Sequence, residues 1–255
     1  MTTSIALVAG VAISILLLWE AAVWYFDLPK ALLPTPRQCF NAAVTHRNAL
    51  LKGTFSTGVA AATGLLVAVV LGSMIAVTFS LSRMIRLAFF PYVIFLQTVP
   101  IVAVAPLLII WSGYTFRTVV IVTVIVCLFP IINGVTTGLL KIDRNLSDLF
   151  RLYGANRRMR LLRLQIPSAI GHLMLGVKTS SGLAVIGAIV AEFFVGNGMK
   201  DDGLGTLMTG WQGLLMTDAL IAALIASAML GLAMFATVHW ISEKLLRRWT
   251  LAHVH

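Results

Sequence analysis

Residues 141–167 read KIDRNLSDLFRLYGANRRMRLLRLQIP and form the longest polar interval in a chain that is otherwise mostly apolar. The interval carries seven Lys or Arg residues against two Asp residues. Four apolar side chains in its first half are spaced 3, 4 and 7 residues apart, which places them on one helical face. They are Leu146, Leu149, Phe150 and Tyr153.

The second half of this interval is punctuated by turn-forming residues. Gly154 suits a helix stop or a sharp corner, and Asn156 can cap a second short helix. We expect that second helix to end at Ile166-Pro167, because the residue before a proline avoids the helical region. The pattern predicts a helix, a glycine corner, a basic helix and a proline break between two membrane spans. A basic loop that only sets membrane topology is the simpler interpretation.

The composition indicates an all-α membrane protein with one domain. Of the 255 residues, 59% are hydrophobic and 11% are charged, whereas soluble domains average about 25% charged residues. Such a chain must be covered by lipid rather than by water. We expect one transmembrane domain over residues 1–255, with a core at about 50–245.

Several other functions are disfavoured by the sequence. The net charge is +10, but the basic residues lie between apolar runs, so we expect no nucleic-acid partner. Two distant cysteines and five scattered histidines predict no metal site. No Gly-rich Lys-Ser/Thr phosphate loop occurs, so we expect no cofactor and no ATP site in this chain. No nucleophile and base form a catalytic pattern, so we expect no catalytic residues.

Six apolar segments predict about six transmembrane helices. They cover residues 5–26, 54–80, 87–111, 116–140, 168–195 and 218–242. We expect a short surface helix at about residues 37–50 and a polar, Gly-rich stretch at 196–217. Gly134 and Gly138 share one face of the fourth segment and favour close helix packing.

Two of these segments carry candidate pathway residues. The third contains three prolines, and polar Gln97 and Thr98 lie beside Pro100, which indicates either a broken helix along a solute route or an ordinary kinked span. The fifth contains Glu192 followed by Phe193. An ionisable residue at membrane depth faces a cavity or a partner, so Glu192 either lines the route or makes a structural hydrogen bond.

The positions of Lys and Arg predict the orientation. With a cytoplasmic N-terminus, twelve of the 19 basic residues fall on the inner side and six on the outer side. This bias favours cytoplasmic N- and C-termini and places residues 141–167 in the cytoplasm.

Residues 141–167 also resemble the cytoplasmic loop of bacterial ABC-importer permeases. That loop runs Glu-Ala-Ala, three residues, Gly-Ala, and about ten residues to a hydrophobic-Pro pair. Here Asp148-Leu149-Phe150 stands at the Glu-Ala-Ala position, Gly154-Ala155 matches Gly-Ala, and Ile166-Pro167 matches the final pair. The resemblance implies a type I importer permease in which this loop is a coupling helix. Leu146, Asp148, Leu149, Phe150, Arg151, Tyr153, Gly154 and Ala155 would then contact an ATP-binding subunit.

Further motifs resemble the nitrate/sulfonate/taurine branch of these permeases. They are Leu33-Pro34-Thr35-Pro36, Gln97-Thr98-Val99-Pro100 through Trp111, Ala191-Glu192-Phe193 and Gly203-Leu204-Gly205. The resemblance implies a prokaryotic inner-membrane protein that carries a small anion such as nitrate, a sulfonate or taurine. It also implies three partners: an ATP-binding subunit that holds ATP and Mg²⁺, an extracytoplasmic solute-binding protein, and a second permease copy.

Two alternatives remain open. Residues 183–192 also resemble permeases for pyrimidine precursors or riboflavin. An ATP-independent channel or ion-coupled carrier is a candidate from a different class, although such proteins need no coupling loop and carriers often contain inverted repeats.

Overall fold

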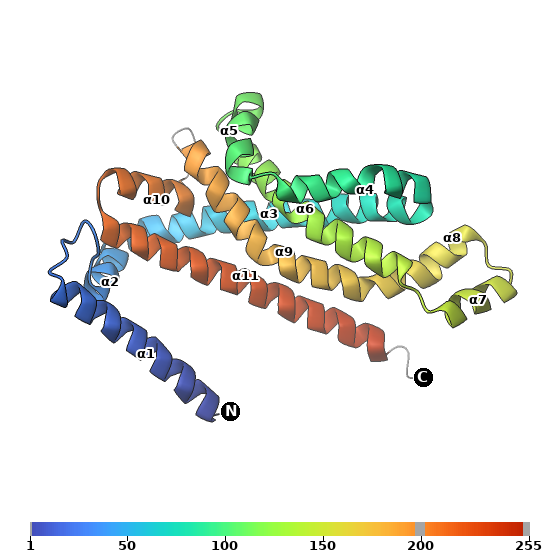
Figure 1. Cartoon of the computed structure of the whole chain (residues 1–255), viewed down its shortest axis with the longest axis horizontal. Helices are drawn as coiled ribbons and strands as arrows, with labels where there is room; N and C mark the ends of the chain where they lie inside the picture. The colour runs from blue at the N-terminus through green and yellow to red at the C-terminus, as the bar shows by residue number, and fades with distance from the viewer. Residues whose placement is uncertain (1, 197–201, 252–255) are drawn as a thin grey trace.

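The computed structural model describes residues 2–196 and 202–251, and every regular element in these ranges is helical. The expected all-α class is therefore confirmed (Figure 1). In chain order the elements are α1 (Thr2–Tyr25), α2 (Pro36–Thr45), α3 (Arg47–Leu81), α4 (Arg83–Thr98), α5 (Ile101–Ser112), α6 (Phe116–Leu140), α7 (Arg144–Leu152), α8 (Arg157–Arg160), the π-helix η1 (Leu161–Gln165), α9 (Ile166–Val195), α10 (Leu204–Gly213) and α11 (Thr217–Leu251).

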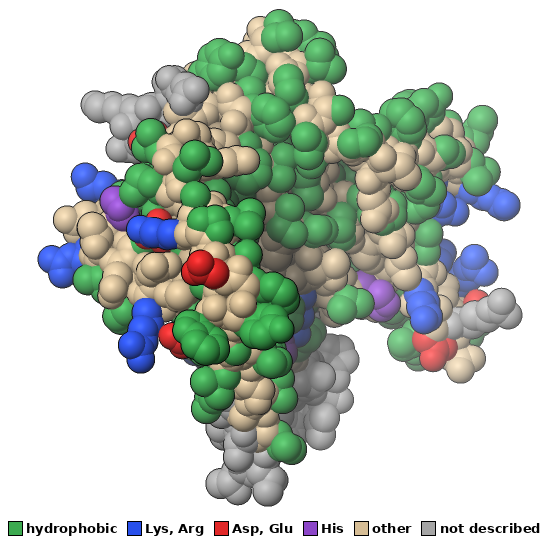
Figure 2. Space-filling view, turned by 60° about the vertical axis from the view of Figure 1, so that its left-hand side comes forward, with side chains coloured by type: hydrophobic (Ala, Val, Ile, Leu, Met, Phe, Trp, Pro, Cys, Tyr) green, Lys and Arg blue, Asp and Glu red, His purple; other side chains and the backbone are tan. Residues whose placement is uncertain are grey.

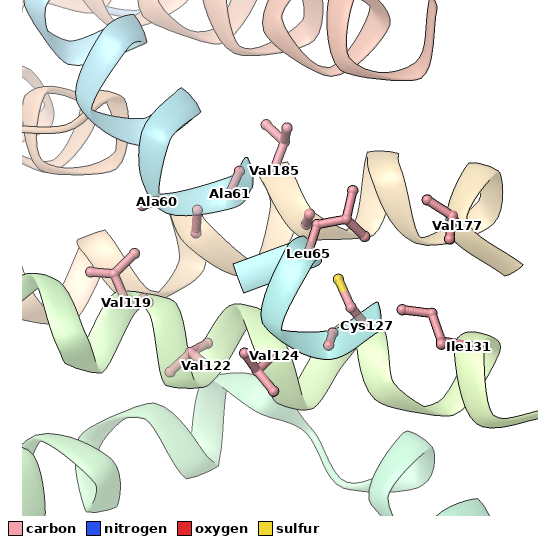
Figure 3. Close-up of a cluster of buried hydrophobic side chains, with 14 of the residues drawn as sticks. Ala60, Ala61, Leu65, Val119, Val122, Val124, Cys127, Ile131, Val177 and Val185 are labelled. Carbon is pink, nitrogen blue, oxygen red and sulfur yellow. The ribbon is translucent and has the colours of Figure 1, made fainter. Parts of the chain in front are cut away.

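The core is a bundle of α3, α6 and α9. Figure 3 shows small and β-branched side chains of these helices meeting in its centre, among them Ala61 of α3, Val122 of α6 and Val185 of α9. Small side chains let helix backbones approach closely, which favours association where lipid removes the usual hydrophobic driving force. The predicted glycine face of the fourth segment is confirmed: a Cβ at Gly138 would lie 2.8 Å from the Ala169 Cα.

A second packed cluster lies at one end of this bundle. It joins Leu50 of α3, Leu204 and Trp211 of α10, and Ala219 and Ala223 of α11. The loop after α1 is tied to the start of α11 by an ion pair of 2.9 Å between Lys30 and Asp218. In Figure 1 this end, with α2 and α10, lies opposite the end that carries α7 and α8.

The helices account for all six expected apolar segments. Within the described residues, four helices are long and apolar enough to cross a membrane: Arg47–Leu81, Phe116–Leu140, Arg157–Val195 and Thr217–Leu246. The pair α4 and α5 adds a fifth, bent by 101° at its break, and α1 contributes the shorter apolar stretch Gly10–Tyr25. Figure 2 shows Lys and Arg mostly toward the two sides of one face, with largely uncharged surface between them.

The proline at 167 does not end a helix, so that expectation was wrong. The chain runs from α8 through η1 into α9 without a break. The amide of Ile166 donates to the Leu161 carbonyl, five residues back. A π-turn widens the backbone, which accommodates a proline that lacks an N–H and would clash with the carbonyl four residues before it.

Two other boundaries differ from expectation. The surface helix expected at 37–50 is α2, which ends at Thr45, and α3 begins at Arg47. Thr35 starts α2 with a capping box to Gln38, followed by Pro36 in the first turn. The stretch at 196–217, expected only to be polar, contains the helix α10.

Candidate coupling and translocation sites

The short helix α7 stands apart at one end of the molecule (Figure 1). Asp143 caps it by accepting a hydrogen bond from the Asn145 amide at 2.7 Å. On the expected apolar face, Leu146 and Leu149 are each 46% exposed, Tyr153 is 83% exposed and Phe150 is half-buried. The described chain therefore leaves most of this apolar face accessible.

Gly154 makes the corner after α7, as the sequence predicted. Its φ is +69°, in the left-handed region that favours glycine. The Gly154 amide donates to the Arg151 carbonyl at 3.0 Å, and the Ala155 amide donates to the Phe150 carbonyl at 2.9 Å. These two bonds are those of a Schellman motif, which ends a helix and fixes the direction of the chain beyond it.

The arm after the corner begins with the capped helix α8. Asn156 caps α8 by accepting from the Met159 amide at 2.8 Å. Asp148 and Arg151 approach within 3.9 Å on the exposed surface of α7, a pair that contributes little to stability. Residues 141–167 thus form a structured protrusion that joins α6 to α9.

The third apolar segment is broken at Pro100, between α4 and α5. Gln97 and Thr98 lie on the last turn of α4 and are exposed, as is Pro100. Gln97 lines a cavity of about 340 Å³ whose other walls come from α4, α5, α6 and α9. The remaining lining residues are Leu96, Val99, Ile101, Ile125, Val126, Pro130 and Leu183.

The structure does not bring the other candidates into this cavity. Thr98 bonds back to its own helix, at the Phe95 carbonyl, over 2.9 Å. Phe193 is 41% exposed and Glu192 only 1% exposed, and neither lines the cavity. The Glu192 carboxylate accepts hydrogen bonds from the Thr57 hydroxyl at 2.9 Å and from the Gly205 amide at 2.8 Å.

Thr57 is a contact that the sequence analysis missed. It is fully buried in a stretch rich in Ala and Gly, and one of several Thr residues in such a span carries no distinguishing pattern. The Gly203-Leu204-Gly205 motif was noticed, but nothing in its sequence indicated that it begins a helix beside Glu192. Within the described residues, no group of three His, Cys, Asp or Glu side chains could hold a metal ion.

Comparison with known proteins identifies the family. Residues 68–249 match the binding-protein-dependent transport system inner membrane component family. The chain is 32% identical to the riboflavin transport system permease protein RibX of Chloroflexus aurantiacus, covering 94% of this chain and 90% of that protein.

Two further relatives are permeases named for other solutes. The formylaminopyrimidine transport permease protein ThiX of Halalkalibacterium halodurans is 29% identical over 91% of each chain. The aliphatic sulfonates transport permease protein SsuC of Bacillus subtilis, named as putative in function, is 25% identical over 91% of this chain and 84% of that protein. The chain therefore belongs to the membrane permeases of binding-protein-dependent ABC importers.

Proposed function

We propose that this chain forms half of the solute pathway of an ATP-driven importer and transmits motion to that pathway through residues 141–167. The observation that carries the proposal is the exposed apolar face of α7, held by a capped N-terminus and a Schellman corner. A loop that only set topology would need neither feature. Burying one large apolar side chain in a partner's groove stabilises a complex by roughly 1.5–3 kcal/mol.

The partner is a separate ATP-binding subunit, which performs the ATP hydrolysis. The contacts with that subunit come from Leu146, Leu149, Phe150 and Tyr153, with Asp148 and Arg151 at the rim. An extracytoplasmic binding protein delivers the solute at the α2/α10 end, and a second copy of the chain completes the route. Both termini and α7 then lie on the cytoplasmic side of a prokaryotic inner membrane.

The route through the membrane passes the break at Pro100. Backbone groups freed by a broken helix are tolerated at membrane depth where they face protein or a water-filled cavity, and Gln97 lines a cavity of about 340 Å³ beside the break. Gln97, Thr98 and Pro100 therefore belong to the route, and Phe193 stands at its outer end.

The solute is either a small anion or a planar heterocycle. A sulfonate permease among the relatives supports nitrate, a sulfonate or taurine. The higher identities to the riboflavin and formylaminopyrimidine permeases favour a heterocycle. The apolar residues and single Gln that line the cavity at Pro100 also suit an uncharged ring better than an anion.

The test is to purify the chain with the ATP-binding subunit and solute-binding protein encoded beside it. The binding protein is first titrated separately with taurine, nitrate, an alkanesulfonate, riboflavin and a formylaminopyrimidine. Reconstituted vesicles should then take up the bound solute only when ATP and both partners are present. Uptake by the permease alone would instead establish a channel or carrier.

A further inference from the structure

The helix α10 begins without a cap of its own. Its N-cap residue is Gly203, which has no side chain to accept from the first amides of the helix. The first amides of any helix have no partner within that helix and must find one elsewhere. In α10 the partners come from two other helices.

Glu192 of α9 and Thr57 of α3 together satisfy two of these amides, those of Leu204 and Gly205. The Gly205 amide donates directly to Glu192 Oε2 at 2.8 Å. The Leu204 amide donates to Thr57 Oγ1 at 2.8 Å, and that hydroxyl donates in turn to the Glu192 carboxylate at 2.9 Å. Three helices, of which α3 lies far from the other two in sequence, are thus joined through one carboxylate.

The surroundings of the carboxylate are shaped for this contact. A Cβ at Gly203 would overlap the Glu192 carboxyl group, and a Cβ at Gly205 would lie 2.7 Å from the Glu192 Cβ. Only glycine lets the start of α10 approach so closely. The carboxyl oxygens of Glu192 face the N-terminus of α10, where the partial positive charge of the helix dipole favours an acceptor.

This contact also sets the rotation of the last turns of α9. Successive residues of an α-helix are about 100° apart around the axis, so a Glu192 that points into the bundle directs Phe193 elsewhere. Glu192 is 1% exposed and Phe193 is 41% exposed. The Thr206 hydroxyl bonds the Glu192 carbonyl at 3.5 Å and adds a second, weaker link from α10.

We propose that Glu192 and Thr57 form a clasp that positions α10 and holds Phe193 outward at the outer end of the pathway. Glu192 is then a positioning residue that the solute does not touch. The part that concerns Phe193 rests on the proposed function, whereas the clasp itself is measurable without transport.

The test of the clasp compares three substitutions on α3 in the permease purified with its ATP-binding subunit. Thr57→Val keeps the shape but removes the hydroxyl, Thr57→Ser keeps the hydroxyl, and Thr63→Val removes a hydroxyl that bonds only within α3, to the Val59 carbonyl. Hydrogen exchange at the Leu204 amide should accelerate roughly tenfold or more in Thr57→Val, because this buried donor loses its acceptor. The other two variants should exchange at the parental rate.

A second variant keeps the proposal testable if Thr57→Val does not assemble. Glu192→Gln preserves the volume but replaces one acceptor oxygen by an NH₂ group that cannot accept, so the Gly205 amide should exchange severalfold faster. A parental exchange rate at Leu204 in assembled Thr57→Val, or at Gly205 in assembled Glu192→Gln, would overturn the clasp.

The positioning role is tested at Phe193 itself. A Phe193→Cys substitution is made in a background in which Cys39 and Cys127 are replaced by Ser. Its maleimide labelling rate should change severalfold when Thr57→Val is added, and Thr57→Ser should restore the original rate. An altered amide exchange with unchanged labelling would keep the clasp and reject its action on Phe193. A failure of ATP-driven uptake in the parental protein would count against the proposed function alone.

Discussion

The Arg160 guanidinium donates a hydrogen bond of 3.1 Å to the Ser147 hydroxyl, and this bond joins the two arms of residues 141–167 across the Gly154 corner. Ser147 lies on α7, whereas Arg160 ends α8, which continues through η1 into the membrane-crossing α9. The bond therefore links the exposed helix to a span, so in the proposed coupling a push on α7 would be passed to the end of α9.

Breaking this link should weaken transmission more than assembly. In Arg160→Gln we expect the ATP-binding subunit to stay bound and to hydrolyse ATP, while solute uptake per ATP falls severalfold. A hydrogen bond to a charged group contributes roughly 1.5–3 kcal/mol, and its loss lets α7 rotate against α8. Uptake and hydrolysis are measured in the same vesicles. Arg158→Gln, at an exposed position on the same short helix, is the control, and an equal loss of coupling in both variants would refute the link.

The corner at Gly154 should tolerate Asn but not Val. A Cβ there meets no atom within 4 Å, so the effect of a substitution comes from the backbone conformation alone. A left-handed φ costs most residues about 1–2 kcal/mol, whereas Asn adopts it more readily. Gly154→Val should weaken binding of the ATP-binding subunit, or leave it bound and uncoupled, while Gly154→Asn stays close to the parent. Co-purification stoichiometry and ATP-driven uptake measure both outcomes. Identical behaviour of the two variants would show that the left-handed conformation at position 154 is not required for coupling.

The apolar face of α7 should be the surface that the ATP-binding subunit contacts. Phe150→Asp places a charge in that face and should reduce the affinity for the subunit at least tenfold, since it removes a buried apolar anchor. Leu152→Asp provides the matched control, because Leu152 is 84% exposed on the same helix but lies about 200° around the axis from Phe150. Titration of the detergent-purified permease with the subunit distinguishes the two, and comparable losses in both variants would point to a general effect of charge.

The orientation is tested by a single introduced thiol. Asn145 is exposed at the start of α7, so Asn145→Cys in a background lacking Cys39 and Cys127 should react with an impermeant maleimide only from the cytoplasmic side. Inverted membrane vesicles should label and intact cells should not. Labelling of intact cells would reverse the proposed topology.

The native thiol at position 39 should react slowly at neutral pH. Burial in α2, together with the nearby Asp218 carboxylate, raises the pKa of the Cys39 thiol, and the thiolate is the reactive form. Labelling of the native protein should therefore increase as the pH rises above the usual thiol range, whereas the denatured protein should already label rapidly near pH 8. The unfolded state loses its thiol proton at lower pH than the folded state, so this residue should reduce stability as the pH rises through that interval. Equal labelling rates in the native and denatured protein at pH 7.5 would contradict the burial of Cys39.

The spans were predictable because each depends on a long apolar run. Residues 116–140 were predicted with the boundaries that α6 shows, and the helix–glycine–helix pattern around Gly154 was confirmed. The spacing of apolar residues and the positions of Gly, Asn and Pro reflect local backbone preferences, and these segments follow those preferences.

The missed features could not be predicted from local residue patterns. The helix α10 has Gly at positions 205, 210 and 213, which lowers its intrinsic helix propensity, and its Leu204 and Gly205 amides are satisfied by Thr57 and Glu192. The helix continues through Pro167 because of the π-turn before it, and no residue pattern in the sequence predicted that turn.

The 101° bend at Pro100 has a consequence for biogenesis. The ring nitrogen of Pro100 cannot donate to a carbonyl four residues earlier, so a single copy newly inserted into lipid exposes an unsatisfied backbone group within the apolar layer. Burial against a neighbouring subunit or hydration of the finished route removes that penalty. In the proposed assembly the same break would line the route, so unpaired copies should be short-lived in the membrane.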